Sequence, residues 1–139
     1  MKLLNILVLL FTIFAAAILS SCSSSKDGRV DIVDAKIVTA IDEKLMPMKV
    51  TDTFPAGTTK ICCWIKWKNA RINTQIISKW HYVTDDVHID NYIFTIPKKE
   101  GMGSVTLTIP PGKNLPVGLY RVDLLVGKRL LESLTFRVE

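Results

Sequence analysis

The sequence predicts an all-β fold, an antiparallel β-sandwich with Greek-key connections and about seven strands, placed after an N-terminal signal helix. Most of the 139 residues form short runs in which apolar and polar side chains alternate. Turn residues separate these runs at spacings of about 8–12 residues, which is typical of sandwiches. No later stretch keeps the period of 3.6 residues that an amphipathic helix needs. A small closed barrel has similar signals and is the alternative.

The N-terminal segment has the pattern of a secretory signal. Lys2 supplies a positive charge, and residues 3–18 are apolar apart from Asn5 and Thr12. This run is shorter than the roughly 20 residues that span a bilayer. Small residues then precede Cys22, as a signal protease requires. We therefore expect export from the cytoplasm.

The end of this segment, Leu19-Ser20-Ser21-Cys22, resembles the lipobox of bacterial lipoproteins at every position. The resemblance implies a signal peptide of residues 1–21, cleaved between Ser21 and Cys22, and a covalent diacylglycerol and N-acyl lipid on Cys22. Several acyl chains hold a membrane firmly. An uncleaved anchor helix and an ordinary secretory signal are the alternatives. The implied location is the cell envelope. Ser23 replaces the aspartate of inner-membrane retention, which favours the outer membrane, facing the periplasm, if the host has one.

Length and composition limit how the rest of the chain can be organised and what it can bind. Residues 22–28 are rich in serine and predict a flexible tether, and residues 29–139 are long enough for one sandwich domain. The formal net charge of +5 is spread along the chain without a basic block. This distribution argues against a nucleic-acid partner and permits a weak preference for anionic lipid or glycan surfaces.

Seven segments read as strands. They are residues 30–41, 59–67, 74–83, 88–97, 103–110, 119–126 and 130–138. The fourth is stopped by Pro97 and a charged turn. The last two are joined by a Gly-Lys pair that predicts a tight hairpin. Residues 42–58 contain two prolines and a glycine, so we expect a loop there with one short edge segment.

The second predicted strand has two different faces. One carries Ile61, Cys63, Ile65 and Trp67, and the other carries Lys60, Cys62, Trp64 and Lys66. The lysines mark the second face as the solvent side. We therefore expect Trp64, flanked by Lys66 and Lys68, to be exposed and to contact a partner pocket or a sugar ring. Two alternatives remain: the first strand covers Trp64, or a bulge exposes Trp67 instead.

The two internal cysteines predict free thiols. Cys62 and Cys63 are adjacent, and neighbouring side chains of a strand point to opposite faces, so they cannot bond each other. We expect Cys63 to be buried and Cys62 to be outward and reactive, with an intermolecular disulfide at Cys62 as the alternative.

Two aromatic residues carry a second resemblance. Trp80 lies on the apolar face of the third predicted strand, and Tyr120 follows a Pro-Val-Gly turn, as in a tyrosine corner. The stretch from Phe54 to Val138 resembles the immunoglobulin-like or fibronectin-III-like modules of bacterial surface and periplasmic proteins. The missing cysteine pair favours the fibronectin-III-like end of that group.

No residue constellation specifies a reaction. The segment after Trp80 gathers His81, Asp85, Asp86, His88 and Asp90. Their spacing matches no standard metal motif, and Met46 and Met48 have no histidine at a fixed distance, so we expect no metal site and no cofactor. A Gly-x-Ser-x-Gly elbow and a phosphate loop are absent from the sequence.

The prediction for function is a non-enzymatic, lipid-anchored β-sandwich. It would bind or scaffold another envelope component, a protein or a glycan. A carbohydrate- or peptidoglycan-binding module is the main alternative, and a metal-handling lipoprotein is a weaker one.

Overall fold

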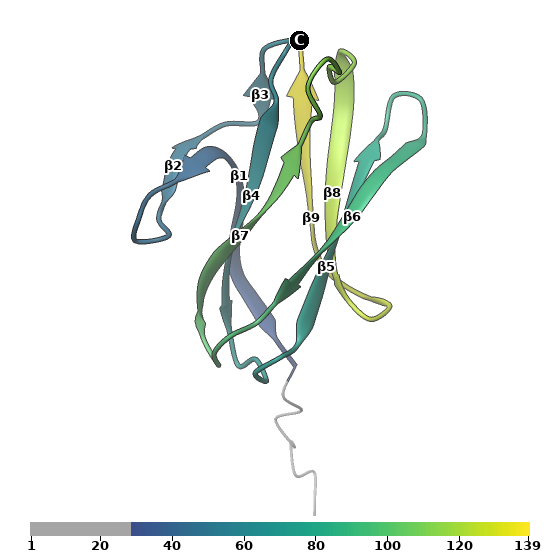
Figure 1. The fold of residues 1–139 in the computed structure, drawn as a ribbon. Coiled ribbons are helices and arrows are strands. Elements are labelled where there is room, and N and C mark those ends of the chain that lie inside the picture. The colour runs from purple at the N-terminus through teal and green to yellow at the C-terminus, as the bar shows by residue number, and fades with distance from the viewer. Residues whose placement is uncertain (1–28) are drawn as a thin grey trace, which may run out of the picture.

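The computed structural model describes residues 29–139, which form a two-layer β-sandwich (Figure 1). Its strands are β1 (Asp31–Ile41), β2 (Pro47–Val50), β3 (Thr53–Phe54), β4 (Lys60–Lys68), β5 (Gln75–Tyr82), β6 (Val87–Thr95), β7 (Gly101–Thr108), β8 (Gly118–Val126) and β9 (Arg129–Val138). The predicted signal helix of residues 1–21, the cleavage site and Cys22, and the tether of residues 22–28 lie outside the described residues. Within residues 29–139 there is no helix with the length and apolar character to cross a bilayer.

The strands are divided between two sheets, and the chain passes from one sheet to the other several times. One sheet has the order β2-β1-β4-β7 and the other β3-β9-β8-β5-β6. The chain changes sheet on entering and leaving the short strand β3, and again between β4 and β5, between β6 and β7 and between β7 and β8, as Greek-key connections do. All pairings are antiparallel except the short parallel contact of β3 with β9. The all-β sandwich is confirmed. It has nine strands within the described residues, because residues 42–58 hold the two short strands β2 and β3 where we expected one edge segment.

The core lies between the two sheets, where the alternating inward side chains meet. β4 contributes Ile61, Cys63, Ile65 and Trp67, as its pattern predicts, and all four are buried. On the facing sheet the ring of Tyr120 stacks on Phe136 at 5.1 Å, and Trp80 meets Phe136 at 6.0 Å. The buried hydroxyl of Ser78 accepts a hydrogen bond of 3.2 Å from Trp80 Nε1, so this polar group is satisfied inside the core.

The loop before β8 is fixed by two tyrosines. The Tyr120 hydroxyl donates a hydrogen bond of 2.5 Å to the Pro116 carbonyl, and the Tyr82 hydroxyl donates one of 2.8 Å to the Val117 carbonyl. Gly118 has a φ of 150°, and a Cβ there would lie 2.6 Å from the Thr84 hydroxyl. The glycine therefore allows the loop to close against Thr84 and the ring of Tyr82. The predicted tyrosine corner at Tyr120 is confirmed.

Candidate functional site

Trp64 lies on the outer face of its sheet, as alternation predicts, but it is not exposed. Its side chain has only 3% exposure. The indole Nε1 donates a hydrogen bond of 2.7 Å to the carbonyl oxygen of Leu45, in the turn that connects β1 to β2. The Lys36 ammonium lies 5.6 Å from the ring centroid, and Val38 packs in the same cluster. The expectation of an exposed Trp64 is therefore wrong, and the alternative of cover from the first strand is correct in part: β1 and the turn after it cover the indole together.

Cys62 is buried in the same cluster as Trp64 and Val38. Its side chain is 8% exposed, and its Sγ lies 3.3 Å from the Thr106 hydroxyl. The expectation of an outward, reactive thiol at Cys62 is wrong. Cys63 is fully buried on the inner face, as predicted, and burial, with smaller contributions from Cys62 and Glu132, raises the pKa of its thiol to about 12. Both thiols are free.

Lys66 and Lys68 are exposed, and they line a hollow of about 350 Å³ at one end of the four-stranded sheet. The other lining residues are Val33, Trp67, Glu100, Gly101 and Met102. Val33 belongs to a bulge of β1 and is 49% exposed. The hollow thus combines apolar side chains with ammonium groups at its rim. The sequence prediction grouped the two lysines with Trp64, whereas the tryptophan that lines this hollow with them is Trp67.

The buried Trp67 forms part of the wall of this hollow. Its Nε1 donates a hydrogen bond of 3.0 Å to the Lys98 carbonyl, so the indole is fixed in place. A Cβ on Gly101 would lie 3.0 Å from the indole ring and 2.7 Å from Lys98 Cε. The close packing of Trp67 against Gly101 explains why a glycine begins β7.

The charges of Lys66 and Lys68 have no ion-pair partner within residues 29–139. Glu100 lines the same hollow without forming an ion pair with either lysine, and two further acids nearby have other partners. Asp34 pairs with Lys36 at 2.7 Å, and the Asp31 carboxylate accepts a hydrogen bond of 2.7 Å from the Asn69 amide. Two uncompensated ammonium groups can attract an anionic partner at ordinary ionic strength over about 8 Å.

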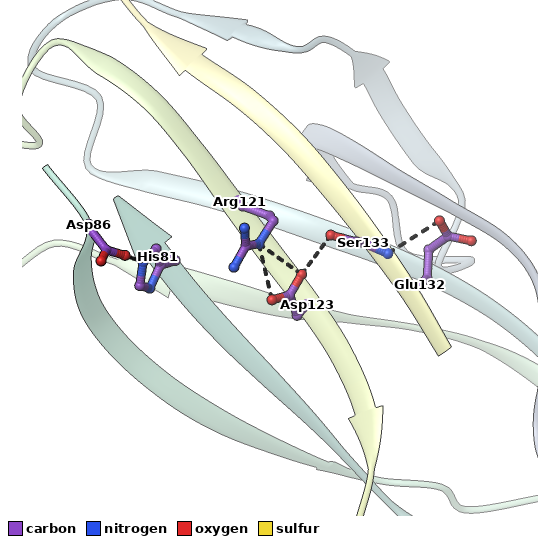
Figure 2. Close-up of polar contacts among 6 residues, drawn as sticks. All are labelled: His81, Asp86, Arg121, Asp123, Glu132 and Ser133. Carbon is purple, nitrogen blue, oxygen red and sulfur yellow. Dashed lines mark hydrogen bonds and ion pairs between the residues drawn. The ribbon is translucent and has the colours of Figure 1, made fainter. Parts of the chain in front are cut away.

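The outer face of the five-stranded sheet carries a polar network, shown in Figure 2. Arg121 Nε lies 3.1 Å from the carboxylate of Asp123, which also accepts a hydrogen bond of 2.6 Å from the Ser133 hydroxyl. His81 Nε2 lies 2.9 Å from the Asp86 carboxylate, in a separate pair. A nucleophilic serine needs an adjacent base that takes its proton. Ser133 instead donates to a carboxylate already paired with Arg121, so this network holds strands together.

The structure does not assemble the acidic and histidine cluster that follows Trp80. Of its members, His81 and Asp86 touch each other. Among residues 29–139, no three His, Cys, Asp or Glu side chains are close enough together to hold a metal ion. Met46 and Met48 are both about half exposed, on and beside β2.

The solved structures that are similar to this chain include an immunoglobulin-like protein and a DNA glycosylase. An immunoglobulin-like protein from Pseudomonas aeruginosa matches with a TM-score of 0.56 and 15% identity over 80% of this chain and 97% of that chain. The alkylpurine DNA glycosylase AlkC of Pseudomonas fluorescens, solved bound to DNA containing an abasic site analogue, matches with a TM-score of 0.50 and 13% identity. That match covers 79% of this chain but 30% of the glycosylase. Neither a protein-family model nor a curated protein matches the chain. At these identities the likeness concerns the fold alone, and the fold is an immunoglobulin-like β-sandwich.

Proposed function

We propose that this chain is a bacterial lipoprotein whose immunoglobulin-like sandwich binds or scaffolds another component of the cell envelope without catalysing a reaction. The observation that carries the proposal is the stretch Leu19-Ser20-Ser21-Cys22, which follows a charged start and a short apolar run. A thiol is the nucleophile that such lipid attachment requires. The mature protein would begin at Cys22, with its lipid in the membrane and its sandwich outside the cytoplasm.

A binding role suits the sandwich better than a catalytic one. Its buried groups serve packing: Ser78 hydrogen-bonds inside the core, and Tyr82 and Tyr120 fix a loop. The serine with the closest carboxylate, Ser133, has no imidazole beside it. The hollow at Lys66 and Lys68 has an apolar wall and unpaired positive charge, which are features of a contact surface.

The prediction of a carbohydrate-binding role depended on an exposed Trp64, and this side chain is buried. The chain has three tryptophans, and Trp64, Trp67 and Trp80 are all buried. A sugar ring stacks on an exposed aromatic face, and no indole provides one. We therefore propose no sugar site.

The anchor is tested by feeding cells labelled palmitate and comparing the native chain with Cys22→Ser. We expect label in the native protein and its recovery in the membrane fraction. The Cys22→Ser variant should remain an unprocessed precursor without label. Cys62→Ser is the matched control, since it also removes one thiol, and it should incorporate label normally. Equal labelling and normal processing of Cys22→Ser would overturn the proposal.

A further inference from the structure

The end of the sandwich at which β1 begins is strongly basic. Three segments distant in the sequence lie at this end: residues 66–74 at and after the end of β4, residues 96–101 leading into β7, and the β8–β9 hairpin at residues 126–130 (Figure 1). Their exposed cationic side chains, called here the basic end, are Lys66, Lys68, Arg71, Lys98, Lys99, Lys128 and Arg129. Glu100 is the one acidic residue in these three segments, and Asp31 at the start of β1, opposite Lys68, adds a second carboxylate at this end.

Hydrogen bonds hold these segments to each other and to the start of the described chain. The Ala70 amide donates to the Lys99 carbonyl at 2.9 Å, which joins the first two segments. The Arg129 guanidinium donates to the Val30 carbonyl at 3.4 Å, which brings the hairpin to the beginning of β1. The cationic groups therefore surround the point from which the chain leads back towards Cys22.

Two apolar side chains project from the same end. Ile72 is 63% exposed, in the segment after β4, and Leu130 is 55% exposed, beside the β8–β9 turn. Basic residues next to exposed aliphatic side chains are typical of surfaces that rest in the headgroup region of a bilayer. The positive charges attract anionic headgroups, and the aliphatic groups enter the boundary with the acyl chains.

The opposite end of the sandwich has a different charge. The turn between β5 and β6 carries Asp85 and Asp86, and the chain ends there at Glu139, while Lys60, Lys113 and Arg137 supply positive charge at the same end. The contrast gives the domain an electrostatic axis, with its basic pole at the start of β1. Such an axis orients a domain near an anionic surface.

We infer that the basic end lies against the anionic phospholipid headgroups of the membrane that holds Cys22. This inference rests on the proposed lipid anchor. Seven peptide units separate Cys22 from Arg29, so a fully extended chain would reach no further than about 25 Å. The anchor thus keeps the basic end near the surface at a high effective concentration, and a weak electrostatic attraction is sufficient to seat it. The opposite end then points away from the membrane, towards a partner.

The full-length protein, reconstituted in vesicles, tests this orientation. A polarity-sensitive nitrobenzoxadiazole probe is attached at Ile72→Cys or, as a matched control, at Val117→Cys on the opposite end, where exposure is 61%. Cys62 and Cys63 are buried, so they leave the introduced thiol as the reactive one. Vesicles contain phosphatidylcholine alone or with phosphatidylglycerol.

We expect the probe at position 72 to show a blue shift and protection from dithionite in anionic vesicles, and to lose both in high salt or in pure phosphatidylcholine. The probe at position 117 should stay accessible throughout. Lys98→Glu with Lys99→Glu should abolish the protection at position 72, whereas Lys113→Glu should leave it intact. Equal accessibility of the two probes in anionic vesicles would overturn the inference.

The mass of the reconstituted protein separates this outcome from failure of the anchor. A chain without acyl groups at Cys22 would contradict the proposed function. The Cys22→Ser form of the protein, labelled only at the introduced cysteine, would then be added to preformed anionic vesicles. Sedimentation with the vesicles and protection at position 72 would support the surface by itself, and the absence of both would overturn it as well.

Discussion

The indole nitrogen of Trp64 donates a hydrogen bond of 2.7 Å to the carbonyl oxygen of Leu45, nineteen residues before it. Leu45 has a positive φ of 61° in the turn between β1 and β2. A residue with a side chain pays for this conformation unless other contacts hold it. The contact with Trp64 is one such restraint, and Trp64 in turn lies in one buried cluster with Val38 and Cys62.

Replacing Trp64 tests this restraint. Trp64→Phe keeps most of the apolar contact but removes the donor, so the free energy of unfolding should fall by about 1–2 kcal/mol. Trp64→Ala also leaves a cavity and should lower it by about 3–5 kcal/mol. Urea denaturation measures both. A loss below half a kcal/mol for Trp64→Ala would mean that the indole is exposed in solution.

Thiol labelling tests the same cover independently. Because Cys62 is 8% exposed and Cys63 is fully buried, a maleimide should react slowly with both in the native protein and rapidly with both after denaturation. Ile72→Cys is a positive control, since that position is 63% exposed. Rapid native labelling of Cys62 would show that the turn after β1 does not stay in place.

The buried thiol of Cys63 predicts a loss of stability in alkali. Its pKa rises from 9.0 to about 12 because burial disfavours the thiolate. Between these values the unfolded chain releases a proton that the folded chain keeps, so the free energy of unfolding falls as pH rises, by up to about 1.4 kcal/mol per pH unit. Burial also raises the pKa of Tyr120 to about 12, which adds to the fall at higher pH.

Cys63→Ala is the control for this pH dependence. It should reduce the slope that begins near pH 9, where the unfolded thiol starts to ionise, while the contribution of Tyr120 remains. Urea melts at several alkaline pH values measure the slope. Identical slopes for the native chain and Cys63→Ala would show that the thiol ionises as readily in the folded protein as in the unfolded one.

The tyrosine corner predicts coupled effects on stability. Tyr120→Phe removes the hydrogen bond to Pro116 and should cost about 1–2 kcal/mol. Tyr82→Phe removes the bond to the neighbouring Val117 carbonyl and should cost a similar amount. Since both hydroxyls fix one loop, the double variant should cost less than the sum. Strict additivity would mean that the two hydroxyls act independently.

Alternation predicted the strands and their faces, because a side chain's direction follows from its parity along a strand. It correctly placed Trp80 and Tyr120 in the core. It was wrong about the exposure of Trp64 and Cys62. The position of a residue along a strand decides on which face of the sheet its side chain lies, but not which other segment of the chain covers that face. The covering turn contains Leu45, whose contact with Trp64 is long-range and leaves no periodic signal.

The basic end could not be recognised from the sequence for a related reason. Lys68, Lys98 and Lys128 lie about thirty residues apart, so no window of the sequence contains a block of charge. Only the Greek-key connections bring their loops to one end of the sandwich. The strands β2 and β3 were too short to give a pattern, at four and two residues.

The proposed function depends on a lipid anchor at Cys22. Intact-mass and N-terminal peptide analysis of the protein extracted from membranes measures this most directly. We predict a mature chain that begins at Cys22 and carries a thioether-linked diacylglycerol. A chain that retains residues 1–21, or one with an unmodified Cys22 thiol, would contradict the claim.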